Sequence, residues 1–425
     1  MLPAMISVEE ARSRILAYFY QIEPETRPLL DALGQTLAED ITATFNIPPL
    51  TNTAMDGYAV RAADTTGASE AEPVVLRVTG EVAAGYIYDG EVESGSAVRI
   101  MTGAPIPEGA DAVVPFEETD ETGMQAPHAA GRLNGRVQVF KPAALGANLR
   151  EAGEDIAAGQ RVMDRGTLLG ASQLGVIASV GRDRVTVTRR PRVAVLSTGD
   201  ELLQPGEARR PGKIYDSNLT SLSALITEFG GVPVPLGVAR DNVEDLTTKI
   251  RQALDTDMVV TSAGVSRGDF DIVKLVLARE GDVDFWTVNM RPGKPLAFGG
   301  LRAGSRLVPH IGLPGNPVSS MIAFEIFGRP AIFTMLGRRD WERPRIRATT
   351  SDRISMVDGR RFYARCVISR RNGGYDAVLT GSQGSGILSG LARANGLAVV
   401  PEGHPDVEAG GEVDVMLLGA PSVGA

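Results

Sequence analysis

The sequence of 425 residues contains a single cysteine, Cys366, and only three histidines. One cysteine excludes an intramolecular disulfide and every zinc site built from several cysteines. The histidines, His128, His310 and His404, are scattered singly, so each is better interpreted as a surface or core residue than as a metal ligand. Any bound metal is therefore expected to be a hard cation held by oxygen atoms, and Mg²⁺ is the first candidate.

Long apolar runs and an excess of basic residues are also missing. No segment approaches the roughly 18 apolar residues that a membrane span requires. The first residues lack the basic-then-apolar order of a secretory signal, so we expect a soluble, cytoplasmic protein that contacts no membrane. The formal net charge of −9, from 43 basic and 52 acidic residues, argues against nucleic acid as a partner. A local basic pocket for an anionic substrate is still compatible with this charge.

The length of the chain exceeds what one hydrophobic core supports, so about two to four domains are expected. Ser7 and Glu10 form a capping-box pattern at the start of a helix predicted over residues 7–18. Residues 73–140 carry short valine-rich runs broken by Gly, Pro and Asp-Gly, which is typical of a β-rich domain. Helical spacing returns over residues 167–180.

The second half of the chain changes character twice. Residues 192–328 alternate strand-like and helical patterns, which predicts an α/β domain with a parallel-type sheet. Its clearest helix is predicted to begin at the Asp216–Ser217 cap and to end at Gly230–Gly231. After Pro344, strand-like runs separated by Gly- and Asn-containing turns predict a compact β domain, either a small barrel or a sandwich.

Two β-branched apolar runs in the α/β segment each break into a small-residue turn followed by carboxylates. They read RVAVLSTGDEL from Arg192 and MVVTSAGVSRGDFD from Met258. In open α/β sheets ligands bind beyond the carboxyl ends of the strands, and small residues such as Ser262 and Gly264 let backbone N–H groups approach a phosphate. The alternative is an ordinary strand-to-helix connection that needs glycine for its backbone angles. Two such turns favour a phosphorylated, metal-bridged ligand.

Three carboxylates are expected at the same edge of this sheet. Glu201 and Asp271 follow the two strands above, and Asp241 follows the strand predicted over residues 232–238. Oxygen ligands with negative charge suit Mg²⁺ that bridges to a phosphate. The alternative interpretation is that these acids cap the N-termini of helices.

Two proline-rich turns carry features that suit anions. NMRPGKPLAF, from residue 289, brings Arg291 and Lys294 together around a Pro-Gly turn, where a guanidinium and an ammonium group suit phosphate or another oxyanion. The alternative is a solvated loop whose charges serve no site. GLPGNP, residues 312–317, places Pro314 and Pro317 in a stiff turn ahead of a predicted helix, whose first N–H groups favour anions.

Three further turns lie nearer the N-terminus. Asp56 lies in TAMDGYAV, Thr102 in RIMTGAPIP and Asp155 in GEDI. Composition alone identifies each of these segments only as a turn.

Taken in order, these motifs resemble the molybdopterin molybdenumtransferase family. The segments that carry the resemblance are TAMDGYAV, RIMTGAPIPEGADAVV, GEDI, VLSTGDEL, IYDSN, SAGVSRGDFD, RPGKP and GLPGNPVS, and they span nearly the whole chain. The family comprises the bacterial molybdenum insertases and is similar to the C-terminal domain of gephyrin.

The resemblance implies a homodimer of multidomain α/β plus β subunits. Each subunit would have a linking domain (1–45 and 141–180), a β-rich insert domain (46–140), a molybdopterin-binding α/β domain (181–330) and a C-terminal β-barrel domain (340–420). The expected partners are adenylylated molybdopterin and molybdate, and the resemblance also admits other cofactor-biosynthesis proteins and molybdoenzyme chaperones.

The resemblance also implies the reaction and its residues. Molybdate would be inserted into adenylylated molybdopterin while the adenylyl group is hydrolysed with Mg²⁺, releasing AMP and molybdenum cofactor. The implied catalytic residues are Asp56, Thr102, Asp155, Glu201, Asp241 and Asp271, the last three as metal ligands. The substrate-binding residues are Ser262, Gly264, Arg291, Lys294, Pro314, Pro317, Arg365 and Ser385. The chain departs from the family at Arg291, where lysine is usual, so the geometry of the oxyanion receptor is expected to differ there.

Two other functions compete with this interpretation. Pterin adenylyltransferases resemble the α/β domain, but they have no equivalent of the 73–140 segment or of the C-terminal β domain. A scaffold like gephyrin would need no acids and bases of this kind, so their presence favours an enzyme.

Overall fold

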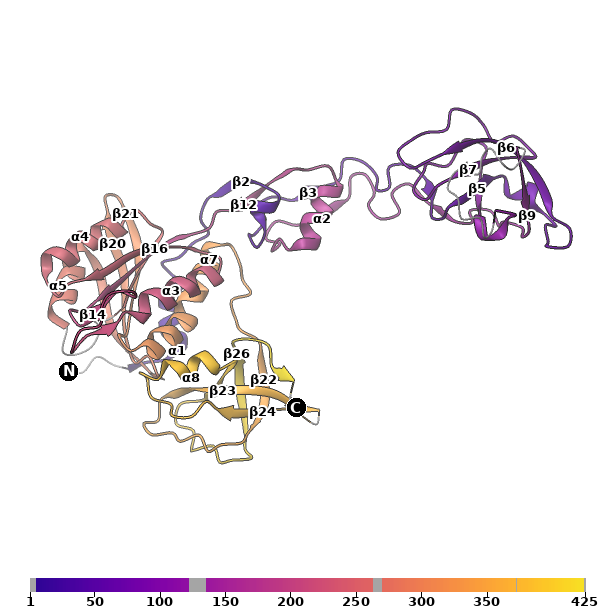
Figure 1. The fold of residues 1–425 in the computed structure, drawn as a ribbon. Coiled ribbons are helices and arrows are strands. Elements are labelled where there is room, and N and C mark those ends of the chain that lie inside the picture. The colour runs from indigo at the N-terminus through magenta and orange to yellow at the C-terminus, as the bar shows by residue number, and fades with distance from the viewer. Residues whose placement is uncertain (1–4, 122–134, 263–269, 372, 424–425) are drawn as a thin grey trace. The chain divides into compact units, whose positions relative to one another are not determined.

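The computed structural model describes residues 5–121, 135–262, 270–371 and 373–423. The chain forms two compact units (Figure 1). The large unit contains Met1–Arg27, Gly34–Ala38 and Thr186–Ala425, and the small unit contains Pro28–Leu33 and Glu39–Val185. No helix in the described part of the chain combines the length and the apolar character needed to cross a membrane.

A seven-stranded mixed sheet forms the centre of the large unit, with the order β1-β18-β20-β21-β17-β13-β16. The strands are β1 (Met5–Ile6), β13 (Arg192–Thr198), β16 (Val232–Ala239), β17 (Met258–Ser262), β18 (Gly281–Val288), β20 (Pro295–Ala303) and β21 (Arg306–Leu313). The predicted parallel arrangement is confirmed for β16, β13, β17 and β21. β20 runs antiparallel to both of its neighbours, which strand–helix alternation did not predict. A Gly-Ser pair joins β20 to β21, with Gly304 at φ +65°, and this is a hairpin signal.

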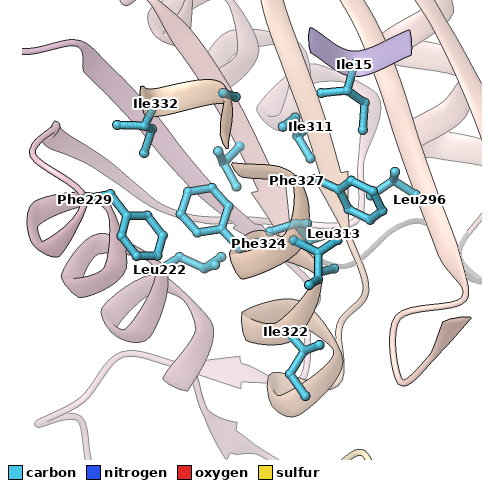
Figure 2. Close-up of a cluster of buried hydrophobic side chains, with 14 of the residues drawn as sticks. Ile15, Leu222, Phe229, Leu296, Ile311, Leu313, Ile322, Phe324, Phe327 and Ile332 are labelled. Atoms are coloured by element: carbon cyan, nitrogen blue, oxygen red, sulfur yellow. The ribbon is translucent and has the colours of Figure 1, made fainter. Parts of the chain in front are cut away.

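Helices cover both faces of the sheet because its central strands are apolar on both sides. Val193 and Val195 of β13 pack into one core, whereas Ala194 and Leu196 pack into the other. The first face carries α1 (Val8–Leu16), α3 (Ser217–Glu228), α6 (Pro317–Ala323), η5 (Phe324–Gly328) and α7 (Arg329–Met335), and the second carries α4 (Val243–Ala253) and α5 (Phe270–Glu280). Figure 2 shows the first core. Each fully buried Leu, Ile or Phe contributes roughly 1.5–3 kcal/mol, which explains why the strands read as continuous apolar runs.

Local signals set the helix starts and the edge of the sheet. Ser7 Oγ accepts a hydrogen bond from Glu10 N (3.0 Å), and an Asp216 carboxylate oxygen accepts one from Leu219 N (3.0 Å), so both predicted caps are confirmed. The edge strand β16 carries Pro233 and Pro235, which cannot donate backbone hydrogen bonds and so protect the edge from further pairing.

A closed five-stranded barrel forms the C-terminal part of the large unit, so the barrel prediction is confirmed. Its strands follow the order β23-β24-β22-β26-β25, and β25 closes the ring on β23. The C-terminal elements are β19 (Met290–Arg291), β22 (Arg345–Thr350), β23 (Arg361–Arg371), β24 (Gly374–Leu379), α8 (Leu388–Arg393), β25 (Gly396–Val400), β26 (Glu412–Leu417) and β27 (Ser422–Val423). Along β23, Phe362, Ala364 and Cys366 fill the barrel core, whereas Tyr363 packs into the core of the α/β part.

The small unit is rich in short strands, as the 73–140 pattern predicted. A five-stranded sheet has the order β8-β5-β7-β6-β9, and two small sheets pair β10 with β4 and β11 with β3. The strands are β3 (Ile41–Thr42), β4 (Asn52–Thr53), β5 (Gly57–Val60), β6 (Val74–Val82), β7 (Ser96–Ile100), β8 (Ala112–Pro115), β9 (Arg136–Val139), β10 (Leu149–Arg150) and β11 (Arg161–Met163). Its helices are α2 (Ala171–Ser179) and the 3₁₀ turns η1 (Leu30–Ala32), η2 (Ala62–Thr65) and η3 (Phe116–Glu118). Outside these sheets, β2 (Pro24–Pro28) and β12 (Arg184–Thr188) lie where the chain passes between the units, and β14 (Leu202–Leu203) pairs with β15 (Ile214–Tyr215).

Candidate functional site

The carboxyl ends of two neighbouring parallel strands, β13 and β16, bring two acidic loops together. The backbone N–H of Asp200 donates a hydrogen bond to Asp241 Oδ2, and the backbone N–H of Asp241 donates one to Asp200 Oδ1. The donor–acceptor distance is 3.3 Å in both. Both residues are exposed, so their carboxylates retain lone pairs for a ligand. Asp241 and Glu201 were predicted from the sequence, whereas Asp200 was not, although it lies in the same GDEL turn as Glu201.

Glu201 lies beside Asp200 in a turn that requires glycine. Gly199 has φ +142°, and a Cβ atom there would lie 2.4 Å from Glu201 Oε2. The Glu201 carboxylate is therefore folded back against the turn. The backbone carbonyl of Glu201 accepts a hydrogen bond from Ile214 N (2.9 Å). Glu201 is exposed and follows the carboxyl end of β13 by three residues.

The third predicted acid cannot be placed by its side chain. Asp271 is the second residue of α5, but the described part of the structure does not include its side chain, and Gly264 lies outside the described residues altogether. Among the described residues, no three His, Cys, Asp or Glu side chains converge as a metal site would require. Asp200, Glu201 and Asp241 thus supply hard oxygen donors at one edge, while the described residues do not complete a ligand set.

Asn218 connects three segments of this edge. Its Nδ2 donates to Ser262 Oγ at the end of β17 (2.6 Å) and to the carbonyl of Gly315 in the GLPGNP turn (2.7 Å). Asn218 belongs to α3 and is buried. Its Oδ1, like Asp216 Oδ2, has no hydrogen-bond partner within the described structure. The sequence predicted a helix cap at Asp216–Ser217 in the IYDSN motif but no role for Asn218, because the partners of Asn218 lie 44 and 97 residues further along the chain.

The GLPGNP turn also meets the barrel. Pro314 is buried, and Pro317 opens α6 with its fixed φ in the first turn. The backbone N–H of Val318 donates to the carbonyl of Ser385 (3.2 Å), which lies in the barrel loop ahead of α8. The structure therefore brings the turn that contains Pro314 and Pro317 into contact with Ser385.

Two cationic side chains come from the RPGKP segment. Arg291 is half-buried, and its Cζ lies 4.7 Å from the centroid of the Phe362 ring, whereas Lys294 is exposed. The guanidinium on Phe362 is held flat by a cation–π contact, which a lysine ammonium would not reproduce in the same orientation.

Arg365 is fully buried under the barrel loop. Its Nη2 donates to the carbonyls of Ser382 (2.9 Å) and Gly384 (3.2 Å). Nε and Nη1 have no hydrogen-bond partner within the described structure, and burial lowers the pKa of the guanidinium. A Cβ atom on Gly390 of α8 would lie 3.3 Å from Nε, so glycine lets the helix pass close to the arginine. Arg365 is thus a fixed cation with donors to spare.

The three N-terminal turns assemble within the small unit. Asp56 Oδ1 accepts hydrogen bonds from Thr102 N (2.6 Å) and Thr102 Oγ1 (2.7 Å), and these two bonds hold the pKa of the Asp56 carboxyl below its ordinary value. Thr53 O accepts from Gly103 N (2.9 Å), and β4 pairs with β10 next to the GEDI turn. Asp155 is exposed in that turn. Asp56 and Thr102 form a direct pair, which sequence spacing alone did not indicate.

Three family models match consecutive parts of the chain. The MoeA N-terminal region (domain I and II) matches residues 6–181, the probable molybdopterin binding domain matches 194–334, and the MoeA C-terminal region (domain IV) matches 347–418. The acidic edge and Asn218 therefore lie in the second region, Asp56 and Thr102 in the first and Arg365 in the third.

Relatives match over almost their whole length. Molybdopterin molybdenumtransferase 2 of Mycobacterium tuberculosis is 37% identical over 97% of this chain and 99% of its own, and molybdopterin molybdenumtransferase of Haemophilus influenzae is 34% identical over 97% and 98%. The crystal structure of the molybdopterin biosynthesis moeA protein from Pyrococcus horikosii superposes with a TM-score of 0.81 at 34% identity, covering 98% of this chain and all of that one. The chain therefore belongs to the molybdopterin molybdenumtransferase family, the transferases of molybdenum cofactor biosynthesis.

Proposed function

We propose that this enzyme inserts molybdenum from molybdate into adenylylated molybdopterin, with hydrolysis of the adenylyl group and release of AMP and molybdenum cofactor. The observation that carries the proposal is the acidic edge of the α/β sheet, where Asp200 and Asp241 hold each other by reciprocal hydrogen bonds. This edge belongs to the region matched by the molybdopterin-binding model. A crevice at the carboxyl ends of parallel strands is the place where such sheets bind phosphorylated ligands.

Mg²⁺ fits the donors at this edge. Asp241 and Glu201 are exposed carboxylates on adjacent turns, and hard oxygen atoms are the ligands that Mg²⁺ prefers. Asp271, at the start of α5, would complete the set. When bound, the ion would neutralise charge on the phosphoanhydride of the substrate. The residues themselves would orient the adenylyl phosphate against the sheet edge, and Ser262 and Gly264 would approach it through a small-residue turn.

Molybdate would be held by the cationic groups around the GLPGNP turn. Arg291, Lys294, Arg365 and Ser385 are the proposed receptor, with Pro314 and Pro317 shaping the turn between them. The unpaired Nε and Nη1 of Arg365 support this assignment, since a buried guanidinium gains from a dianion that accepts its remaining hydrogen bonds.

The test is Mg²⁺-dependent release of AMP from adenylylated molybdopterin in the presence of molybdate. We expect Asp241→Asn and Asp271→Asn to raise the Mg²⁺ concentration needed for half-maximal release. Asp282→Asn, which changes an exposed acid on β18, is the matched control and should leave release unchanged. If wild-type protein releases no AMP, the proposed reaction is wrong; formation of adenylylated molybdopterin from ATP would instead identify an adenylyltransferase, and inactivity in both assays would favour a scaffold.

The assembly is part of the same proposal. We propose four domains, with boundaries at 1–45 plus 141–180, 46–140, 181–330 and 340–420, in a cytoplasmic homodimer whose active sites each take Asp56, Thr102 and Asp155 from one chain and Lys294 and Glu201 from the other. Other proteins of cofactor biosynthesis and molybdoenzyme chaperones would receive the product.

Co-expression tests this arrangement. A heterodimer of Asp56→Ala and Lys294→Ala chains, each inactive as a homodimer, should recover about half of the wild-type activity, because one pocket receives both changes and the other receives none. An inactive heterodimer would instead indicate that each site lies within a single chain.

A further inference from the structure

A second cationic site lies in the large unit, in a cleft between α1, α7, the segment before β22 and the barrel. We call it the arginine cleft, after Arg12, Arg329, Arg343, Arg345 and Arg361 in its wall. Three glutamates, Glu9, Glu325 and Glu342, also line it. None of the residues assigned above to the molybdenum insertion site lines this cleft.

Two of the five arginines are neutralised by neighbouring acids. Arg361 forms ion pairs with Glu9 and with Glu402 (3.1 Å). Arg343 donates two hydrogen bonds to the Glu325 carboxylate, from Nε to Oε1 (2.7 Å) and from Nη2 to Oε2 (3.1 Å). Glu325 is therefore fully engaged by Arg343.

Arg329 is left without a close acid although its side chain is only 9% exposed. The nearest ion-pair contact within the described structure is Glu325 Oε1, 3.8 Å from Arg329 Nε and already held by Arg343. Its closer contacts are neutral: Nη1 donates to the carbonyl of Trp341, and the guanidinium lies over the Phe333 ring at 4.5 Å. Asp340, which is paired with Arg338, acts on Arg329 only as a nearby charge. Burying a cation with only a shared carboxylate beyond hydrogen-bond distance is costly, and an anionic ligand would offset that cost.

Two further arginines in the wall keep free donors. Arg12 of α1 stacks on the Trp341 ring at 4.4 Å, a contact that uses the face of the guanidinium and leaves its N–H edges available. Arg345, at the start of β22, is exposed and forms no ion pair among the described residues. Arg12 acts on the Glu9 carboxylate, which is already paired with Arg361. The cleft thus has five arginines and three glutamates in its wall, in a chain of net charge −9.

We propose that the arginine cleft binds a phosphate-type oxyanion carrying at least two negative charges, held jointly by Arg12, Arg329 and Arg345. Guanidinium groups match such oxyanions because their N–H donors form paired, charge-assisted hydrogen bonds. The three arginines come from α1, α7 and β22, so a bound anion joins the α/β layer to the barrel. The site is independent of the proposed reaction, since it shares no residue with it.

The experiment titrates inorganic pyrophosphate into the full-length protein by isothermal titration calorimetry at constant ionic strength. Lys294→Gln is present in every sample, so that the proposed molybdate receptor does not contribute to the signal. We expect one saturable site, with affinity reduced about three- to tenfold by Arg12→Gln or Arg345→Gln, because each removes one partly solvated charge. Arg302→Gln, at an exposed arginine of β20, is the matched control and should retain full affinity.

Arg329→Gln should abolish pyrophosphate binding. If this buried substitution prevents folding, the Arg12→Gln and Arg345→Gln variants test the proposal. Three results would overturn the proposal. They are no saturable binding to the Lys294→Gln protein, an affinity in the Arg12→Gln and Arg345→Gln variants that equals that of the Lys294→Gln protein alone, and a loss of affinity in Arg302→Gln as large as in those two variants. The last result would mean that pyrophosphate responds only to overall charge.

Discussion

Replacing Asn218 with alanine should loosen both the end of β17 and the GLPGNP turn, because the Asn218 amide holds Ser262 and Gly315 at once. Each hydrogen bond contributes about 1 kcal/mol to stability. Ser262 is 1% exposed, so its hydroxyl also loses a buried partner at a cost of about 1–3 kcal/mol, whereas exposed Gly315 can turn to water. The bond to Gly315 and the loss at Ser262 together amount to about 2–4 kcal/mol. Alanine also removes Asn218 Oδ1, which has no partner in the described structure and costs about 1–3 kcal/mol, so the expected net loss in the free energy of unfolding is about 1 kcal/mol.

The assay pairs urea unfolding with steady-state AMP release. A loss of this size leaves the protein folded, since domains are stable by about 5–15 kcal/mol. We expect a higher KM for adenylylated molybdopterin, because Ser262 and the GLPGNP turn would no longer be held in register. Asn218→Asp should not rescue either property, because a carboxylate accepts hydrogen bonds but does not donate them.

Asn395→Ala is the matched control. Asn395 exchanges two hydrogen bonds with Ile368 in the barrel, and its removal should lower stability without raising the KM. If Asn218→Ala unfolds like the wild type, or if both variants raise the KM equally, the Asn218 amide does not organise the site.

Three further predictions concern single groups. Thr102→Val removes one of the two hydrogen bonds that lower the pKa of the Asp56 carboxyl, so an NMR titration should show that pKa rising towards its ordinary value; an unchanged pKa would contradict the pairing. Burial lowers the pKa of His310 to about 3, so below pH 6.5 the unfolded chain binds a proton that the folded chain excludes, and stability falls by about 1.4 kcal/mol per pH unit from this group. Urea unfolding of His310→Gln, whose amide can still bond Thr261, should show a shallower loss between pH 7 and pH 5, and an equal slope would refute this. Arg365→Lys keeps the charge but loses the guanidinium fork, so the molybdate concentration for half-maximal insertion should rise about ten- to a hundredfold while the KM for adenylylated molybdopterin stays near that of the wild type; an equal effect on both would place Arg365 outside the receptor.

Features that depend on neighbouring residues in the chain were predictable from the sequence. The caps at Ser7 and Asp216 and the apolar runs of β13 and β17 are set by local hydrogen bonding and by burial on both faces of a strand. The shared edge of the acids after β13 and β16 was predictable too, because the carboxyl ends of adjacent parallel strands must share one edge.

Features that depend on distant pairing were not predictable. Asn218 holds the GLPGNP turn through a hydrogen bond to Gly315, which lies 97 residues further along the chain. Asp200 follows β13 and is hydrogen-bonded to Asp241, which follows the neighbouring strand β16. The antiparallel β20–β21 hairpin was missed because the strand–helix alternation around it outweighed one Gly-Ser turn. The resemblance implied that Arg365 binds substrate but did not predict its burial. The alternation along β23 explains that burial, because the even-numbered neighbours of Arg365 fill the barrel and Arg365 projects to the side covered by the loop and α8.

Asn218 and Arg365 share a physical property that links packing to function. Both are buried, and each keeps polar atoms without a partner within the described structure, Oδ1 on Asn218 and Nε with Nη1 on Arg365. Each such atom costs about 1–3 kcal/mol relative to a satisfied one. The apolar faces of the central sheet offset that cost, since each buried large side chain contributes roughly as much. The free energy of unfolding is thus lower than it would be if these polar atoms had partners. A ligand that forms hydrogen bonds with them gains that difference as binding free energy.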